Sequence, residues 1–253
     1  MSLTINQWNE RFKQQAQWTK SLRNFLYSRI DIRHAGRVLD VGCGTGVLLE
    51  ELRQISPCRD YGVDINYYSL KFTQESIPLS LLTQGNALYL PFCSLTFDVV
   101  LCHFLLLWVK DPFRVIKEMV RIIRPGGYVM ALAEPDYGGR IDFPKELAQL
   151  GKWQTEALRE QGADPLIGRQ IQSLFSLAGL SDIETGVLGG RWDNHQTEQE
   201  IELEWDVLQS DLYLNEEFIQ SAAKYKALDK SSRINQQRIL YVPTFYAIGC
   251  VDS

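Results

Sequence analysis

The 253-residue sequence contains no apolar stretch long enough to cross a bilayer. Its most apolar segment, residues 97–109, is interrupted by Asp98 and His103 and is shorter than the roughly 20 residues that a spanning helix needs. The N-terminus also lacks a basic start followed by an apolar run, so we expect no secretory signal. These absences predict a cytoplasmic protein without a membrane span.

Cysteine is scarce, with five residues, an odd number, and no Cys-x-x-Cys pair. This pattern predicts neither a disulfide framework nor a zinc site, and we expect no bound metal. We interpret the cysteines as reduced thiols that pack as small apolar groups, which suits a reducing cytoplasm.

An excess of positive charge is also missing, because 26 Lys and Arg residues face 31 Asp and Glu residues and give a formal net charge of −5. Nucleic-acid binding proteins usually carry a basic surface, so we expect no nucleic-acid partner. The chain is 45% hydrophobic and 23% charged, an ordinary globular balance. Its length fits one α/β domain, with or without an insertion.

Strand and helix patterns alternate through the first 135 residues or so. Short apolar, β-branched runs predict strands, and amphipathic or capped segments between them predict helices: strands at 37–41, 60–64, 79–83, 97–102 and 128–133, and helices at 47–55, 66–75 and 111–123. This alternation predicts a parallel sheet with helices on both faces. Ligands bind such sheets beyond the carboxyl ends of the strands, so the loops after Val41, Asp64, Cys102 and Ala133 should share one functional edge.

We predict a single domain, residues 1–253, in four segments. Residues 1–35 form an N-terminal helical cover, 36–190 the core sheet and helices, 191–237 a helical insertion or lid, and 238–253 the final strand. The insertion is predicted because residues 197–230 are polar, rich in Glu and helical in pattern, whereas 181–188 and 238–251 have strand patterns.

Three glycines alternate in the loop after the first predicted strand, which reads Asp40-Val41-Gly42-Cys43-Gly44-Thr45-Gly46. Glycine allows a ligand to lie against the main chain, and the helix that follows offers free amides to a carboxylate or a phosphate. A dinucleotide fingerprint requires G-x-G-x-x-G/A. Its last position falls on Val47 or Leu49, depending on the register, so the fingerprint fails in both.

The strict G-x-G-x-G form, led by Asp40, resembles motif I of the class I S-adenosylmethionine-dependent methyltransferases. The resemblance spans roughly residues 36–133 and favours the small-molecule group that includes the ubiquinone and menaquinone enzymes. It continues through further motifs: Gly85-Asn86-Ala87, Leu90-Pro91-Phe92, Phe97-Asp98-Val99-Val100, Leu107-Trp108 and Arg124-Pro125-Gly126-Gly127. It implies a doubly wound, mostly parallel seven-stranded sheet with an antiparallel last strand, the Rossmann-like methyltransferase fold, plus the helical insertion.

The resemblance also implies S-adenosylmethionine as cofactor, S-adenosylhomocysteine as product, and a set of cofactor-binding residues. Asp40 would lie near the ammonium group, and the loop residues Gly42, Cys43, Gly44, Thr45 and Gly46 would hold the amino-acid end. Asp64, followed by Ile65, can accept hydrogen bonds from both ribose hydroxyls, although a dehydrogenase would use an acid there too. Asn86, followed by Ala87, stands where the family usually has an acid that reaches the adenine amino group; a plain turn is the alternative.

Methyl transfer from a sulfonium is an in-line displacement that depends mainly on positioning, so no prominent catalytic motif is required. His103, after the fourth strand, is the best candidate near the methyl group and is also assigned to the cofactor site. Glu134 and Tyr137, after the fifth strand, are further catalytic candidates. A structural role remains an alternative for His103.

Aromatic side chains of the N-terminal helix, Trp8, Phe12 and Trp18, either cover the cofactor or pack in the core. The Gly168-Arg169 and Arg191-Trp192 pairs are candidate acceptor contacts, with surface charge as the alternative for each arginine.

The leading hypothesis is an enzyme that transfers a methyl group from S-adenosylmethionine to a small-molecule acceptor. Two alternatives remain at this point: an NAD-dependent oxidoreductase, and a non-catalytic S-adenosylmethionine-binding protein. The sequence leaves open whether the protein is a monomer or a homodimer.

Overall fold

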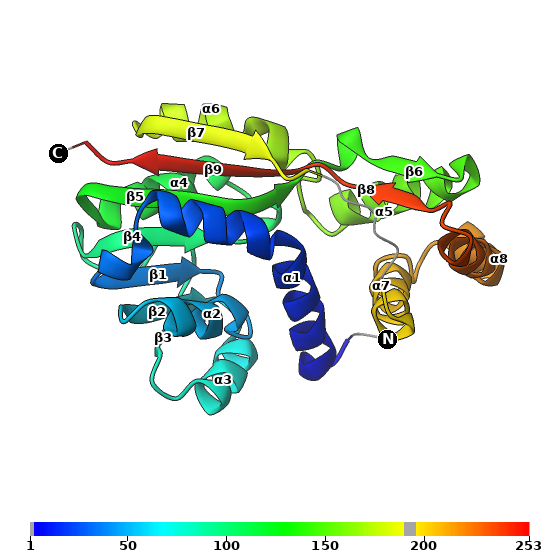
Figure 1. Ribbon diagram of the computed structural model, residues 1–253, viewed down its shortest axis with the longest axis horizontal. Coiled ribbons are helices and arrows are strands. Elements are labelled where there is room, and N and C mark those ends of the chain that lie inside the picture. Colours follow the sequence, from blue (N-terminus) through cyan, green and yellow to red (C-terminus); the bar gives the residue numbers. More distant parts are fainter. Residues whose placement is uncertain (1–2, 190–195, 253) are drawn as a thin grey trace.

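The computed structural model describes residues 3–189 and 196–252. Its centre is a seven-stranded sheet of order β3-β2-β1-β4-β5-β9-β7 (Figure 1). Strand β9 runs antiparallel to both of its neighbours, and the pairs β1–β2, β1–β4, β2–β3 and β4–β5 are parallel. The strands are β1 Arg37–Val41, β2 Arg59–Asp64, β3 Leu81–Gln84, β4 Phe97–Cys102, β5 Ile123–Pro135, β7 Ser181–Val187 and β9 Thr244–Cys250. The predicted fold class is confirmed.

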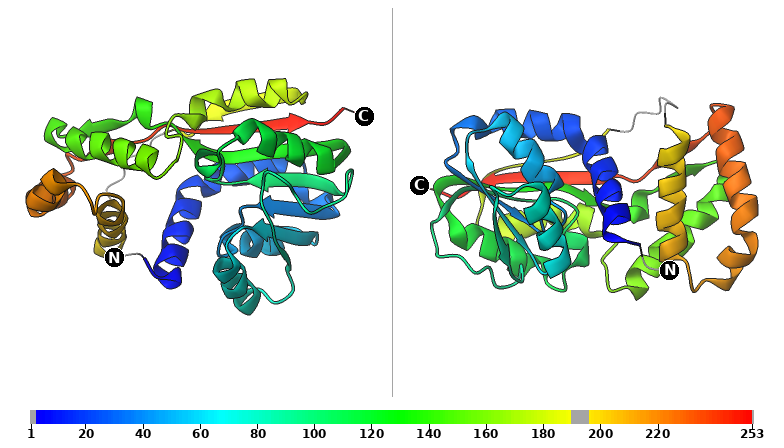
Figure 2. Two further views of the ribbon diagram at one scale, coloured as in Figure 1. Left: turned by 180° about the vertical axis from the view of Figure 1, so that it is seen from behind. Right: turned by 90° about the horizontal axis from the view of Figure 1, so that it is seen from below.

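Alternating side chains of the central strands separate the core into two layers. Leu39 and Val41 of β1 pack on the side of α4 and α6, whereas Val38 packs on the side of α1, α2 and α3. Both faces are covered by helices (Figure 2), so apolar side chains occupy both faces of these strands. The helices are α1 Ile5–Arg29, α2 Val47–Ile55, α3 Tyr67–Ser76, α4 Pro112–Ile122 and α6 Ile171–Leu177.

Two helix starts follow the capping rules that the sequence indicates. The Oδ1 atom of Asn66 accepts a hydrogen bond from the amide of Tyr68 at 2.9 Å and so caps α3. Asp111 accepts from the amide of Arg114 at 2.9 Å, and Pro112 occupies the first turn of α4. Both caps satisfy amides that have no partner within the helix.

A second, smaller unit projects from one end of the sheet, and we call it the cap. Strand β6 pairs antiparallel with β8, which directly precedes β9 in the chain (Figure 1). Its elements are β6 Ile141–Phe143, α5 Ala148–Glu160, α7 Glu198–Asp211, α8 Glu216–Ile234 and β8 Ile239–Tyr241. Its own apolar core consists of Leu147, Leu150, Trp153, Ala157, Trp205, Leu208, Leu212 and Phe218.

The cap draws on more of the chain than the predicted insertion at 191–237. Helix α5 lies in the range assigned to the core segment, yet its Trp153 packs against Phe218 of α8 at a ring separation of 6.2 Å. Strand β6 is only three residues long, too short for a recognisable alternation pattern. Within the predicted insertion, residues 191–195, including the candidate contacts Arg191 and Trp192, lie outside the described residues.

The helices of the described ranges include none that is both long and apolar enough to span a membrane. Helix α1 has 25 residues, which is sufficient length, but it carries Arg11, Lys13, Lys20, Arg23 and Arg29.

Candidate active site

The loops that the sequence assigns to one functional edge do lie together. Val41, at the end of β1, is in register with Val63 of β2 and with Cys102 of β4. Asp64 is in register with Gln84 of β3. The residues that follow these four strands therefore line one edge of the sheet, at the carboxyl ends where α/β proteins bind their ligands.

The glycine loop adopts backbone angles that side chains resist. Gly42, Gly44 and Gly46 have φ values of 75°, 51° and 79°, in the left-handed region that favours glycine. The Oδ2 atom of Asp64 accepts a hydrogen bond from the amide of Gly44 at 2.8 Å, so the carboxylate after β2 fixes the loop after β1. Phe12 of α1 lies against Gly44, 3.1 Å from the position that a β-carbon would occupy, so α1 covers the loop.

Asp40 is a carboxylate buried on the side of the sheet that α1 covers, with an exposed fraction of 3%. Burial, with a smaller contribution from the charge of Asp64, raises the pKa of Asp40 to about 8, and the nearby charge of Arg23 opposes this rise. A buried acid with so little compensation is an unfavourable arrangement for the protein alone. A cationic group placed beside Asp40 would relieve it.

Thr45 supplies a second unsatisfied group in the loop. Its Oγ1 atom is buried and has no hydrogen-bond partner among the described residues. Buried polar atoms are normally paired, so both Asp40 and Thr45 fit a loop built around a charged, polar ligand. The amino-acid end of S-adenosylmethionine has this chemistry.

The remaining predicted cofactor residues lie further along the same edge. Ile65 is exposed, and the Oδ1 atom of Asp64 accepts from the amide of Asn66 at 2.8 Å. Asn86 is exposed, and its Oδ1 atom accepts from the amide of Leu88 at 2.9 Å. Asn86 therefore forms a turn, which is the alternative role predicted from the sequence. The nitrogen of its side-chain amide can still donate a hydrogen bond.

His103 follows β4 and is joined to α1, because its Nε2 atom lies 2.9 Å from Oγ1 of Thr19. The same hydroxyl accepts a hydrogen bond from Arg23, which is itself held by Glu51 at 2.8 Å. Burial and the charge of Arg23 lower the pKa of His103 to about 3. The imidazole is thus neutral at pH 7, which suits a hydrogen-bonding role and makes it a weak base.

Glu134 is fully buried beneath the loop that follows β4. Its Oε1 atom accepts from the amides of Leu105 and Leu106 at 3.1 and 3.0 Å, and Oε2 accepts from Leu107 at 3.3 Å. Burial raises its pKa to about 8, against the effect of these three amides. These contacts show that Glu134 holds the loop after β4 in place, with its carboxylate directed at backbone amides and not at an acceptor.

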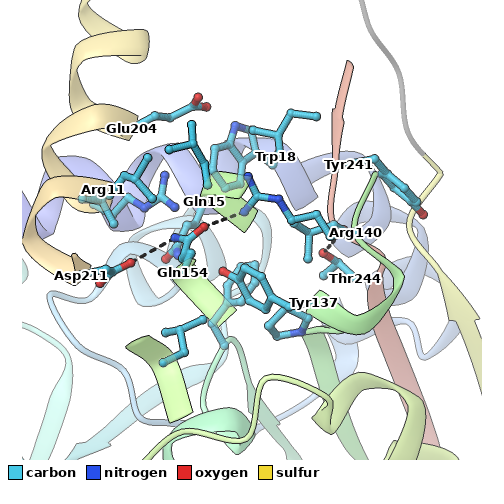
Figure 3. A pocket seen from close by; sticks show the side chains of 18 of the residues that line it. Arg11, Gln15, Trp18, Tyr137, Arg140, Gln154, Glu204, Asp211, Tyr241 and Thr244 are labelled. Atoms are coloured by element: carbon cyan, nitrogen blue, oxygen red, sulfur yellow. Dashed lines mark hydrogen bonds between the residues drawn. The ribbon is translucent and has the colours of Figure 1, made fainter. Parts of the chain in front are cut away.

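A cavity of about 1000 Å³ lies between α1, the end of the sheet and the cap (Figure 3). This is large enough for a drug-sized organic molecule. Its described walls are mostly apolar and aromatic, with several polar groups among them: Trp8, Trp18, Phe104, Leu107, Trp108, Leu150, Leu158, Ile201, Trp205, Leu208, Tyr213 and Leu240, with Arg11, Gln15, Thr19, Tyr137, Arg140, Gln154, Gln161 and Asp211.

Of the three predicted catalytic residues, Tyr137 lines this cavity. His103 contacts it indirectly, through Thr19. Asp136, next to Tyr137, is instead buried in an ion pair with Arg169, whose Nη2 atom lies 2.7 Å from Oδ1. Arg169 therefore holds the loop after β5 in place. Its ion pair with Asp136 accounts for the position of the arginine, so no contact with an acceptor is needed to explain it.

The sequence interpretation missed most of the polar cavity wall. Arg11 and Gln15 were not singled out, although they share one helical face with the predicted aromatic residues Trp8 and Trp18. The spacing of three, four and three along 8, 11, 15 and 18 was the available signal. Asp211 belongs to the cap, and no sequence pattern ties it to α1.

Comparison with known proteins agrees with a site for S-adenosylmethionine on this edge of the sheet. The family described as "Methyltransferase domain" matches residues 39–131. A demethylmenaquinone methyltransferase of Geobacillus sp. (strain WCH70) is 31% identical over 193 residues, which cover 68% of this chain and 81% of that protein.

Two solved structures share the fold at low identity. The [4+2]-cyclase SpnF has a TM-score of 0.60 at 16% identity and covers 92% of this chain and 81% of its own. A Haemonchus contortus phosphoethanolamine N-methyltransferase 2, solved with S-adenosylhomocysteine, has a TM-score of 0.56 at 16% identity and covers 86% of this chain and 49% of its own. The relative above 30% identity, matched over most of its length, carries the assignment beyond the fold: this chain belongs to the class I methyltransferases, and S-adenosylmethionine is its methyl donor.

Proposed function

We propose that this methyltransferase methylates a small organic molecule that binds in the cavity between α1, the sheet and the cap. The observation that carries the proposal is the cavity itself, about 1000 Å³ in volume and walled on one side by α1, whose Phe12 covers the glycine loop. We also propose a cytoplasmic protein with one methyltransferase domain.

The cofactor site in this proposal consists of the residues that the sequence indicated. Gly42, Cys43, Gly44, Thr45 and Gly46 provide the close-approach loop, with the Thr45 hydroxyl as a free polar group.

Asp40 supplies the charge for the ammonium group. Asp64 has both oxygens turned toward backbone amides of its own edge and retains lone pairs for the ribose. Ile65, Asn86 and Ala87 would lie beside the adenine of the cofactor. His103 is the last of the proposed cofactor-binding residues.

When bound, S-adenosylmethionine supplies an electrophilic methyl group on a sulfonium whose leaving group departs uncharged. The task of this chain is therefore to orient the acceptor and exclude water. Thr19 connects the two halves of the site, because it lines the cavity and also binds His103. His103, neutral at pH 7, can accept a hydrogen bond but removes protons poorly, so an acceptor that must lose a proton would need to be acidic itself or use water.

The test is calorimetric binding of S-adenosylhomocysteine to the wild type and to Gly44→Arg. We expect binding to be lost, because Gly44 has a positive φ and Phe12 lies against it. Gly162→Arg is the matched control, since Gly162 also has a positive φ, of 85°, but no atom within 4 Å of its β-carbon position. Equal binding by both variants would contradict the assigned cofactor site.

Acceptor binding is tested separately. Methyl turnover of a panel of small molecules is compared between the wild type and Leu208→Trp, a variant in which the larger side chain narrows the cavity from the cap. We expect the variant to keep S-adenosylhomocysteine binding and to lose turnover. A variant that keeps full turnover would place the acceptor elsewhere. Cofactor binding without turnover of any acceptor would favour the non-catalytic alternative.

A further inference from the structure

The charged groups on the cap side of the cavity form a chain of alternating ion pairs. Asp142 binds Arg140 at 2.6 Å and Arg238 at 2.8 Å. Asp229 binds Arg238 at 2.7 Å and Arg233 at 3.0 Å, and Arg233 also binds a glutamate of α7, Glu204, at 2.9 Å. Three arginines thus face three acids, so this chain of side chains carries no net charge.

Arg11 of α1 lies outside that chain and has no acidic partner of its own. Its guanidinium donates to Oε1 of Gln14 at 2.8 Å and stacks over the ring of Trp18, 4.8 Å from the ring centre. Within residues 3–189 and 196–252, no carboxylate lies within 4.0 Å of it. A guanidinium has five N–H donors in a planar fork that matches a carboxylate, and four of these remain for a ligand.

Two neutral donors lie beside Arg11 in the cavity (Figure 3). The side chains of Gln15 and Tyr137 make no hydrogen bond with any other described residue. Burial keeps the pKa of Tyr137 above its usual value, so its hydroxyl is protonated at pH 7 and can donate.

Asp211 also lies near Arg11 in the cavity, and among the described residues it forms no ion pair within 4.0 Å. Gln154 donates to its Oδ2 atom at 3.0 Å and accepts from Arg140 at 2.7 Å, so it is fixed at both ends. Burial raises the pKa of Asp211, and its hydrogen bond with Gln154 and the charge of Arg11 oppose this rise. The charges of Glu204 and Asp211 favour the protonated form of Arg11, but within the described residues neither carboxylate binds the guanidinium directly. The N–H donors of Arg11 therefore remain available to a carboxylate of a ligand.

We propose that the methyl acceptor is a mainly apolar molecule with one carboxylate, which Arg11 binds together with Tyr137 and Gln15. This rests on the proposed function, since it names the substrate class of the same cavity. The aromatic and aliphatic walls bury the body of the acceptor, and Arg11 selects its anionic end. The acceptor carboxylate also supplies the direct ion pair that the half-buried Arg11 lacks among the described residues.

The experiment measures binding of matched probes to protein saturated with S-adenosylhomocysteine. The probes are 2-naphthoate, 2-naphthamide and 2-naphthylmethylammonium, with decanoate, decanamide and decylammonium as an open-chain set. We expect a carboxylate to bind about tenfold or more tightly than its amide, as hydrogen bonds to charged groups imply. In Arg11→Gln this preference should disappear while amide binding stays unchanged.

Lys13→Gln is the control, because Lys13 is an exposed cation on the same helix and pairs with Glu10. Arg11→Lys should restore part of the preference, and Tyr137→Phe should reduce it; melting curves check that each variant is folded. The proposal is overturned if no carboxylate binds more tightly than its amide, or if Lys13→Gln acts like Arg11→Gln. It is also overturned if the ammonium probe binds best and loses affinity in Asp211→Asn. Failure of S-adenosylhomocysteine to bind would instead count against the proposed function.

Discussion

The sheet core and the cap are stabilised in different ways. Around β1, β4 and β5 the contacts are almost wholly apolar, and the strands are buried on both faces. The cap has a small apolar core and, beside it, the chain of ion pairs through Asp142 and Asp229. Hydrophobic burial is non-directional and stabilises any sequence that fills the space, whereas buried charges are favourable only with their specific partners. The cap, which forms one side of the proposed acceptor cavity, is therefore the more easily altered of the two regions.

The largest expected effect is in the sheet core. Phe97 is fully buried and makes edge contacts with Tyr61 and Phe92, each at 5.1 Å between ring centres. Phe97→Ala should lower the free energy of unfolding by ~4 kcal/mol, because it leaves a cavity between these rings. Denaturant unfolding measures this, and Phe113→Ala, at a side chain that is 39% exposed, should cost far less. Similar costs for both variants would mean that the core is not packed as described.

The next effect should be confined to the cap. Asp229 accepts from Trp205, Arg233 and Arg238, so Asp229→Asn leaves two buried arginines without their shared counterion. We expect a loss of ~3 kcal/mol in local stability. Hydrogen exchange should become faster in α7 and α8 but not in β1 or β4, and S-adenosylhomocysteine binding should persist.

Asp206→Asn is the matched control on α7, because Asp206 appears in none of these ion pairs. Equal loss of protection from exchange in the sheet and in the cap would show that the two regions unfold as one unit. It would contradict the conclusion that they are stabilised in different ways.

The last prediction concerns Asp40, the carboxylate that is buried beneath α1 on the sheet. The pKa of Asp40 is about 8 in the folded protein and about 4 in an unfolded chain. Below pH 4 the acid is protonated in both states. Between pH 4 and 8 only the unfolded state releases its proton, so stability falls as the pH rises through this window.

Asp40→Asn should therefore be clearly more stable than the wild type at pH 8 and nearly equal to it in stability at pH 4. Melting temperatures at several pH values measure this, with Glu75→Gln, an exposed acid, as a control that shows no such trend. The same variant should bind S-adenosylhomocysteine less tightly. A stability difference that does not vary with pH would contradict the elevated pKa.

Local patterns in the sequence were sufficient to predict most of the sheet. Apolar runs, the caps at Asn66 and Asp111, and the glycine loop each depend on residues close together in the chain, so the alternation of strands and helices could be predicted. The antiparallel direction of the final strand came from the resemblance to the methyltransferase family. Strand β6 and the place of α5 in the cap could not, because three residues show no periodicity and a helix pattern does not say which neighbour it packs against.

The sequence by itself determined the fold, the cofactor and the loops that meet at the functional edge, since each follows from local backbone preferences and a motif within about 100 residues. Only the tertiary structure decided the partners of the polar side chains. It showed that Glu134 is bound by backbone amides, that Asp136 pairs with Arg169, and that Arg11 faces the cavity with no carboxylate of the described residues bound to it directly. The charge state and availability of a side chain depend on residues distant in the chain, which no local pattern specifies.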